Sequence, residues 1–285
     1  MRAPQLGRNV RLNRVKTAMR DQRVHTGMGQ VSLLVDDRSG GLPIVFMHGV
    51  FLDKTLWTAF GPEVTGRTHV YIDMPAHGAS GNVGRDWHLD ECVEMLLTVL
   101  DEINVSRCIV IGHSWGSMTA LRAAIRAPSR FAALGLFNMP FTRNEGLGRL
   151  GFRLQKLLTV FPRFYARQAA RSLYTESALK AHPEYSAAMQ DRLSARPPKE
   201  ISRVIDAVLL NPGDGTNLLK ELTVPTLAVV GQSDYVGEPP GLNVTVVPGG
   251  HISPHEAPEE TRAALKHIVL LAGVRANICL EPTRG

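Results

Sequence analysis

The sequence predicts an α/β fold: a mostly parallel central sheet flanked by helices, with a helical insertion. Short continuous apolar runs recur along the chain, as expected for strands that are buried on both faces. Segments with helical spacing of apolar residues alternate with these runs, which favours parallel strands joined by helices. The alternation stops between about residues 141 and 211, where only helical spacing continues. We therefore expect a core of residues 28–140 and 212–272, interrupted by a helical cap over residues 141–211.

The elements follow in chain order. The apolar runs that we interpret as strands are residues 31–35, 43–47, 69–72, 108–111, 131–137, 225–230 and 244–247. Apolar residues at 92, 93, 96, 97 and 100 predict a helix over 90–103, and a second helix is expected over 118–126. Within the insertion, Leu150, Leu154 and Leu157 repeat at helical spacing. Further helical pieces are expected over 176–195 and 199–210, separated by Pro197 and Pro198.

Composition limits the class of protein. The 285 residues are 44% hydrophobic and 20% charged, which is ordinary for a globular protein. No apolar run approaches the ~20 residues that a membrane helix needs. Cys92, Cys108 and Cys279 are an odd number without metal-ligand spacing, so we expect reduced thiols in a cytoplasmic protein. The sequence has no dinucleotide fingerprint or phosphate loop, and we predict no cofactor and no metal.

The net charge of +6 is partly local, because residues 1–20 hold six basic residues and no acidic one. We interpret residues 1–27 as a basic, disordered N-terminal extension, with an arginine-rich transit peptide as the alternative. Residues 273–285 are expected to form a C-terminal tail. No zinc-finger or RNA-recognition motif accompanies the positive charge, so nucleic acid is not an expected partner.

The segment Gly112-His113-Ser114-Trp115-Gly116 is the strongest candidate for chemistry. An apolar strand precedes it and a helix follows, the context in which a G-x-S-x-G segment forms a sharp turn that exposes the serine. Side chains two residues either side of the serine would collide in such a turn, which explains both glycines. The turn also places Ser114 at a helix N-terminus, which favours negative charge. We predict that Ser114 is a nucleophile.

A serine hydroxyl needs a base, and the base needs an acceptor that orients it. His251 follows the last apolar run after two glycines and is the predicted base, with His255 as its main rival. Asp234 follows another strand and is the predicted acceptor, with Asp73 and Asp214 as rivals.

The developing oxyanion needs hydrogen-bond donors as well. Trp115, the residue after the nucleophile, offers one backbone N–H. The loop that begins at His48-Gly49 is expected to offer the second from Val50.

With these residues in place, the chain resembles the α/β-hydrolase family over about residues 28–269. His48-Gly49 followed by Trp57 is similar to the family's oxyanion loop. DMPAHGAS at 73–80 is similar to its D-x-P-G-x-G-x-S segment, with Ala76 in place of the first glycine. GHISPHEAP at 250–258 is similar to the stretch around its catalytic histidine. The resemblance implies a Ser114–His251–Asp234 triad beneath a helical cap. It differs in one respect, since only 17 positions separate Asp234 from His251, where family members usually place a whole helix.

The family's epoxide hydrolases and haloalkane dehalogenases carry aspartate at the position of Ser114. The serine here therefore implies acyl transfer to water, from a small-molecule carboxylic ester through an acyl-enzyme. Lactones, thioesters and β-diketone-type carbon–carbon bonds fit the same scheme. A cofactor-free oxygenase, a haloperoxidase-like enzyme and a ligand-binding protein without turnover are the alternatives. Replacement of Ser114 by alanine should abolish hydrolysis but spare ligand binding or an oxygenase activity.

The expected cap is basic where it begins. Residues 146–173 contain no acid and six cations, namely Arg149, Arg153, Lys156, Arg163, Arg167 and Arg171. This pattern is typical of a solvated helix face. The alternative is that it attracts an anionic acyl substrate or an anionic membrane surface. The expected partner is thus a small-molecule acyl substrate that is hydrophobic or anionic.

Overall fold

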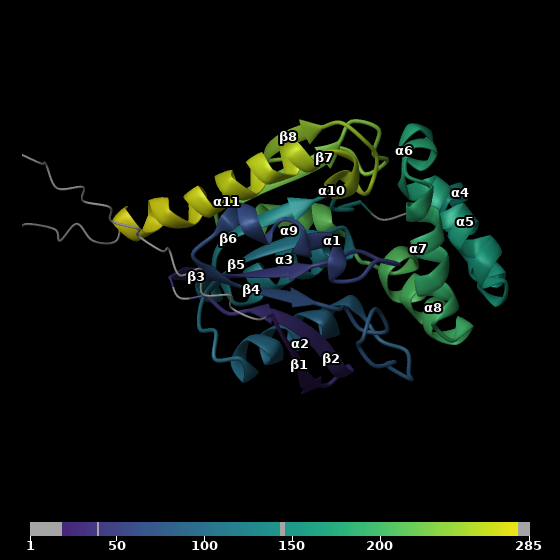
Figure 1. Cartoon of the computed structure of the whole chain (residues 1–285), viewed down its shortest axis with the longest axis horizontal. Helices are drawn as coiled ribbons and strands as arrows, with labels where there is room; N and C mark the ends of the chain where they lie inside the picture. Colours follow the sequence, from purple (N-terminus) through teal and green to yellow (C-terminus); the bar gives the residue numbers. More distant parts are fainter. Residues whose placement is uncertain (1–18, 39, 143–145, 279–285) are drawn as a thin grey trace, which may run out of the picture.

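The computed structural model describes residues 19–38, 40–142 and 146–278. Within them, eight strands form one sheet (Figure 1). The strands are β1 (Arg20–Thr26), β2 (Gly29–Asp36), β3 (Gly41–Met47), β4 (Arg67–Ile72), β5 (Cys108–His113), β6 (Phe131–Phe137), β7 (Thr226–Gly231) and β8 (Asn243–Val247). Their order is β1-β2-β4-β3-β5-β6-β7-β8. From β4 to β8 all neighbours are parallel, whereas β1 and β2 are antiparallel to their neighbours. The predicted fold class is confirmed.

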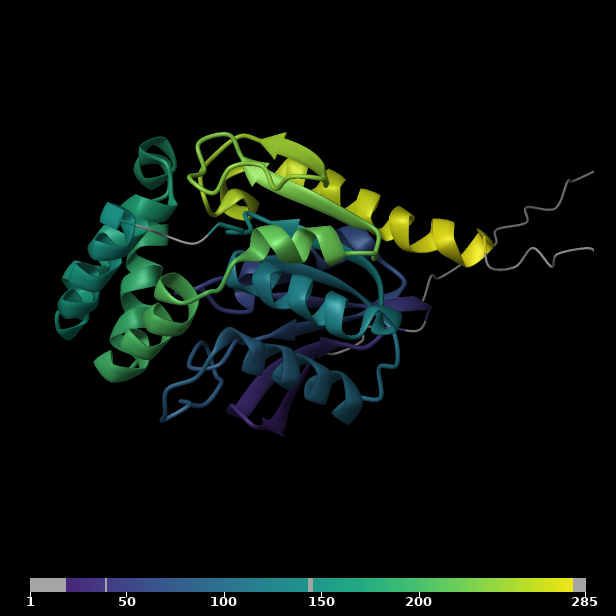
Figure 2. The same cartoon turned by 180° about the vertical axis from the view of Figure 1, so that it is seen from behind.

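Helices cover both faces of this sheet. The core helices and 3-10 turns are α1 (Thr55–Thr58), η1 (Gly61–Val64), α2 (Leu89–Glu102), α3 (Trp115–Arg126), η2 (Pro128–Arg130), α9 (Gly215–Glu221), α10 (Ser253–Glu256) and α11 (Pro258–Ile278). Helices α2, α3 and α9 lie on one face, and α11 packs with η1 on the other (Figures 1 and 2). The central strands β5 and β6 are buried along their whole length, which explains their continuous apolar sequence.

Between β6 and β7 the chain forms a separate helical layer, which we call the cap. Its elements are α4 (Gly146–Leu157), η3 (Leu158–Val160), α5 (Pro162–Leu173), α6 (Glu176–Ala181), α7 (Pro183–Ser194), α8 (Pro198–Val204) and the π-helix η4 (Ile205–Leu210). Pro183 separates α6 from α7, where the sequence suggested one helix. The two stems of the cap meet where Gly215 N donates to Phe141 O at 2.9 Å.

The expected N-terminal extension is wrong for residues 20–26, which form β1. This strand pairs with β2 along its whole length. Only Val24 of β1 is buried, as is typical of a polar edge strand, so no apolar run marks it in the sequence. The expected C-terminal tail begins too early, because α11 continues to Ile278. Residues 1–18, residues 279–285 and Cys279 lie outside the described residues.

The length and polarity of the helices also bear on membrane insertion. Across the parts of the chain that the structure describes, no helix is long and apolar enough to cross a bilayer.

Candidate active site

Ser114 occupies the turn between β5 and α3. Its backbone has φ 50° and ψ −110°, a strained conformation for a residue with a side chain. A Cβ on Gly112 would lie 2.4 Å from Ser117 N, and one on Gly116 would lie 2.6 Å from Met47 O. Both glycines are therefore required by close backbone approach, for the reason expected from the sequence.

The structure brings Ser114, His251 and Asp234 together in one hydrogen-bonded chain. The Ser114 Oγ lies 2.8 Å from His251 Nε2. On the other side of the ring, His251 Nδ1 lies 2.9 Å from Asp234 Oδ1. Ser114 and His251 are each 3% exposed, and the Asp234 carboxylate is fully buried. Each residue follows the carboxyl end of a parallel strand, which gathers all three at one edge of the sheet.

Asn138, directly after β6, holds the second oxygen of Asp234. Its Nδ2 donates to Asp234 Oδ2 at 2.7 Å, and its Oδ1 accepts from Ser253 Oγ at 2.5 Å. Asn138 adopts φ 49° and is fully buried. Burial alone would raise the pKa of Asp234. The hydrogen bond and charge of His251, together with the Asn138 amide, outweigh burial and lower that pKa below its ordinary value. The carboxylate is thus kept ionised.

The rivals of these residues have other partners. The His255 ring lies 2.7 Å from the Tyr174 hydroxyl and stacks on Tyr185. Asp73 accepts hydrogen bonds from Lys54 and Ala79, and so links the two loops that contain these residues. Asp214 accepts from Thr216 N at the start of α9. None of these three contacts His251 through a hydrogen bond that the described residues contain.

His113, next to the serine, fixes the histidine loop. Its Nε2–H donates to the backbone oxygen of His251 at 2.7 Å. Burial, and then the neighbouring His251, lower the pKa of His113 to about 3, so the ring stays neutral and keeps this donor. The same loop is tied to the cap, because His251 N donates to Leu173 O at 2.9 Å.

The loop after β3 is the place where the second oxyanion donor was expected. His48 Nδ1–H donates to Gly49 O, and Phe51 N donates to His77 Nε2 at 3.0 Å. These bonds fix the loop and occupy the amide of Phe51. No hydrogen bond among the described residues occupies the backbone N–H of Val50 or of Trp115. Both amides are available, as the sequence-based assignment requires.

Two cavities lie between this loop and the cap. The first, of about 180 Å³, has no ionised side chain in its wall and is lined by Val50, Phe51, Phe152, Gln155, Tyr165, Ala169, Ser172, Leu173, Leu209 and Tyr235. The Tyr235 ring stacks on the ring of His251, with centroids 4.8 Å apart, so this cavity adjoins the candidate base.

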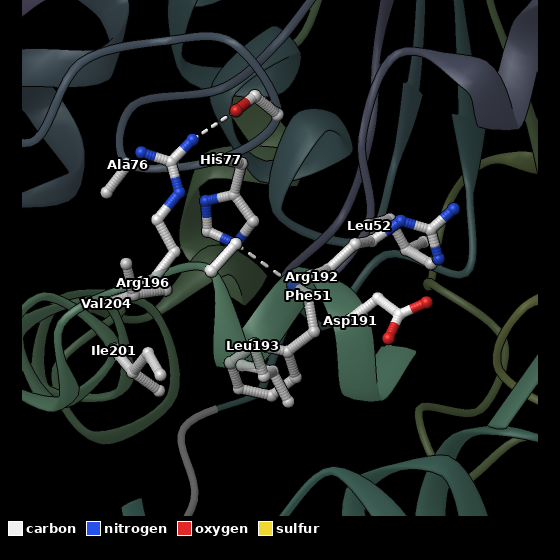
Figure 3. A pocket seen from close by; sticks show the side chains of 12 residues that line it. Phe51, Leu52, Ala76, His77, Asp191, Arg192, Leu193, Arg196, Ile201 and Val204 are labelled. Carbon is white, nitrogen blue, oxygen red and sulfur yellow. Dashed lines mark hydrogen bonds between the residues drawn. The ribbon is translucent and has the colours of Figure 1, made fainter. Parts of the chain in front are cut away.

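The second cavity, of about 290 Å³, lies between Phe51, Leu52, residues 76–78 and helices α7 and α8. Figure 3 shows His77 bonded to the backbone of Phe51, and Arg196 on the side of Ile201 and Val204. Phe51 is the single residue that lines both cavities within the described chain. Its ring packs edge-on against Tyr165, with centroids 5.6 Å apart. Phe51 therefore separates the two spaces.

No role was predicted from the sequence for Asn138 or for His77. Asn138 follows an apolar run, but nothing in its sequence context shows which residue its amide contacts. His77 carries no motif of its own beyond its place in DMPAHGAS. Their partners, Asp234 and Phe51, lie far away in the sequence, so only the folded chain reveals these contacts. A search of the described residues finds no group of three or more His, Cys, Asp or Glu that could hold a metal ion.

Several known proteins are similar to this chain in sequence. One relative, the dihydrolipoyllysine-residue acetyltransferase component of an acetoin cleaving system from Pseudomonas putida, is 27% identical over 78% of this chain, which spans 61% of that protein. The pimeloyl-[acyl-carrier protein] methyl ester esterase of Methylococcus capsulatus is 28% identical over 72% of this chain and 81% of the esterase.

Solved structures show the same fold. A thermophilic esterase from Thermogutta terrifontis superposes with a TM-score of 0.77 at 23% identity, over 89% of this chain and 99% of that one. An enol-lactonase from Burkholderia xenovorans gives a TM-score of 0.78 at 15% identity, over 87% of this chain and 100% of that one. The model of the alpha/beta hydrolase family matches residues 44–264. Since that match spans the serine turn, Asp234 and His251, the chain belongs to the alpha/beta hydrolase family.

Proposed function

We propose that the protein is a serine hydrolase that transfers the acyl group of a small, uncharged carboxylic ester to water. Ser114 is the nucleophile, His251 the general base and Asp234 the acceptor that orients it. One observation carries this proposal: the unbroken chain of hydrogen bonds from Ser114 Oγ through the His251 ring to the buried Asp234 carboxylate. Such an arrangement activates a hydroxyl that is otherwise a poor nucleophile.

In the first half-reaction, Ser114 Oγ attacks the ester carbonyl carbon while His251 Nε2 takes the hydroxyl proton. The carbonyl oxygen becomes an anion that the amides of Val50 and Trp115 stabilise. When the tetrahedral intermediate collapses, the C–O bond to the alcohol breaks and His251 gives its proton to the leaving oxygen. Asp234 stabilises the imidazolium between these steps. Water activated by His251 then hydrolyses the acyl-enzyme by the same route and restores the Ser114 hydroxyl.

The cap defines the substrate in this proposal. The cavity beside Val50 is neutral, and its volume of about 180 Å³ suits a small apolar group. If each heavy atom needs roughly the ~30 Å³ of a water molecule in the liquid, the cavity holds about six. The absence of ionised groups in this wall favours the hydrophobic substrate over the anionic one. The esterase named among the relatives supports the reaction class.

Lactones, thioesters and β-diketone-type carbon–carbon bonds require the same machinery and belong to one substrate screen. The cytoplasmic location remains a proposal based on reduced thiols, and Cys92 and Cys108 are both unpaired and buried.

The test is intact mass after treatment with a fluorophosphonate, on wild type and on Ser114→Ala. We expect one adduct on Ser114 in the wild type and none in the variant, together with loss of p-nitrophenyl ester hydrolysis by about 10³-fold or more. Wild-type protein that stays unlabelled while folded would contradict the proposal. Ester hydrolysis that survives Ser114→Ala would also contradict it, whereas an oxygenase activity or ligand binding that the variant retains would indicate one of those alternatives.

A further inference from the structure

The outer face of the cap exposes an unusual amount of apolar surface. Within the described residues, ten large hydrophobic side chains are strongly exposed, and six of them fall in residues 150–164. These six are Leu150, Leu154, Leu157, Val160, Phe161 and Phe164, with exposed fractions from 50% to 69%. Single exposed apolar residues are common, whereas a cluster marks an interaction surface. We call these six residues the apolar patch.

The patch follows from helix geometry. Leu150, Leu154 and Leu157 are four and three positions apart, so they lie on one side of α4. Val160, Phe161 and Phe164 continue it through η3 into the start of α5. Helices α4 and α5 lie at the end of the molecule farthest from the sheet in both views (Figures 1 and 2). The patch therefore faces away from the core and contributes little to folding.

The opposite sides of the same helices face inward. Phe152 and Gln155 of α4 and Tyr165 and Ala169 of α5 line the cavity beside Val50. Helix α4 thus has an apolar side that the fold uses and a second apolar side that it leaves open, and Phe161 and Phe164 extend the open side to the start of α5. A helix of a solitary globular protein normally has one apolar stripe, with polar residues on its other side.

Positive charge surrounds the patch. Arg153, Arg163, Arg167 and Arg171 are exposed, and the last three repeat every four residues along α5. Residues 146–173 hold no acid that could balance them. The other two cations of this segment contact the π-helix η4. Arg149 donates a hydrogen bond to Leu210 O, and Lys156 forms an ion pair with Asp206. An apolar surface flanked by arginines is the composition of helices that lie in the interface of anionic membranes.

We propose that the apolar patch and its four arginines bind the surface of an anionic lipid bilayer, with α4 and α5 lying in the interface. A second copy of the chain fits less well. In a two-fold dimer the patch would face itself and bring the four arginines of each copy against those of the other. Anionic lipid headgroups supply the opposite charge, and their acyl chains accept the leucine and phenylalanine side chains.

The placement has a consequence for the substrate, which rests on the proposed function. Because α4 and α5 form both the lipid-binding side and the wall of the cavity, bound protein holds this cavity next to the bilayer. The esters it reaches are then apolar molecules dissolved in the membrane. Lipid binding itself requires neither Ser114 nor turnover. The proposal of lipid binding and the proposal of serine hydrolysis can therefore each be disproved without the other.

The experiment is flotation of the full-length protein with vesicles of phosphatidylcholine, with and without phosphatidylglycerol. We expect wild type and Ser114→Ala to bind the anionic vesicles equally and the neutral ones weakly. Each arginine contributes about a fivefold factor to partitioning onto an anionic surface, so Arg163→Ala with Arg167→Ala should weaken binding about 25-fold. Leu154→Ser with Phe161→Ser should weaken it too, by removing inserted side chains. Hydrolysis of a water-soluble ester should remain unchanged in both variants.

The matched control replaces exposed residues on the core, Leu270→Ser with Arg107→Ala, and should bind like wild type. Wild type that fails to bind anionic vesicles would overturn the proposal. Cap variants that bind as tightly as the control would also overturn it, since the basic N-terminus would then be the lipid contact. A dimer of the wild type that Leu154→Ser dissociates, without lipid binding, would identify a second copy as the occupant.

Discussion

Asn138 shows how one side chain at the sheet edge can support the chemistry. Its amide donates to Asp234 and accepts from Ser253, so both ends of the amide are used. A buried carboxylate that loses a donor becomes harder to keep ionised. Among the described residues the Asn138 side chain makes no hydrogen bond to Ser114, and it does not line the cavity beside Val50, so we regard it as a positioning residue that acts through Asp234.

Asn138→Ala should therefore lower kcat with little change in KM. A hydrogen bond to a charged group contributes ~1.5–3 kcal/mol, which corresponds to a loss of about ten- to a hundredfold. The pKa of Asp234 should rise, so activity at the acid side should be lost at a higher pH than in the wild type. Steady-state kinetics across pH tests this. Ser253→Ala should lower kcat less than Asn138→Ala does. If Asn138→Ala keeps the wild-type kcat at all pH values, Asn138 has no positioning role.

Phe51 is the residue on which chain-length preference should depend, since it separates two cavities of about 180 and 290 Å³. Phe51→Ala should join them and allow longer acyl chains. Each further buried methylene is worth ~0.8 kcal/mol, so kcat/KM should rise about fourfold per added carbon beyond the wild-type optimum. A series of p-nitrophenyl esters measures this. Leu52→Ala enlarges the second cavity alone, so it should keep the wild-type dependence of kcat/KM on chain length. If Phe51→Ala also keeps that dependence, Phe51 does not separate the two cavities.

At the scale of elements, the turn between β5 and α3 was predictable because its signal is local: two glycines flank a serine within five residues. A Cβ on Gly112 would meet backbone of the same turn, at Gly116 and Ser117, whereas a Cβ on Gly116 would meet Met47 of strand β3. The edge strand β1 was not predictable in the same way. Its sequence, RDQRVHT, has one buried position, and its structure depends on pairing with β2. Edge strands of this kind carry charge rather than apolar periodicity, so the usual pattern is missing.

Gly112→Ala should destabilise the fold by about 1–3 kcal/mol, because the new Cβ meets Ser117 N and the backbone of Gly116. Gly151→Ala is the matched control in α4, where a Cβ meets no atom within 4 Å. That variant should gain about 0.5–1 kcal/mol from the better helix propensity of alanine. Urea denaturation of both proteins gives the two free energies. If the two variants are equally stable, a side chain at position 112 causes no steric clash, and glycine is not required there.

For the molecule as a whole, buried neutral histidines govern the response to acid. Burial lowers the pKa of His77 and His113 to about 3 and that of His255 to about 4. Unfolding returns each to ~6.5, so between roughly pH 6.5 and 4 the unfolded chain binds protons that the folded chain does not. Stability therefore rises with pH in this range and is lost as the pH falls.

Each of these histidines should contribute a slope approaching ~1.4 kcal/mol per pH unit. We expect the melting temperature to drop steeply from pH 6.5 towards pH 4.5, which differential scanning fluorimetry would measure. His255→Gln should reduce the slope, whatever its effect at neutral pH. A melting temperature that is constant from pH 7 to 5 would contradict this assignment.

Features that depend on residues close together in the sequence could be predicted, and features that depend on distant residues could not. Ser114, Asp234 and His251 could be placed at one edge because each follows an apolar run that ends at that edge. The pairing of Asn138 with Asp234, and of His77 with Phe51, depends on which strands are neighbours and on loop geometry. The cavities and the exposed cap surface depend on which side of each helix faces inward. These features require the assembled molecule.

The hydrogen bond from Gly215 N to Phe141 O closes the base of the cap. The chain thus leaves the core for the cap and returns to it at two neighbouring positions. Strand β6, helix α9 and strand β7 would form a complete β-α-β crossover without the cap. A different contiguous segment could replace the cap there, provided that it replaces the contacts that the cap makes with the core, such as Leu173 O with His251 N and Arg192 with Asp53. The cap's share of the cavity wall is thus encoded in one contiguous stretch of the gene, whereas Ser114, Asp234 and His251 lie outside it, so recombination at two codons could change that part of the wall and leave the triad and Phe51 in place.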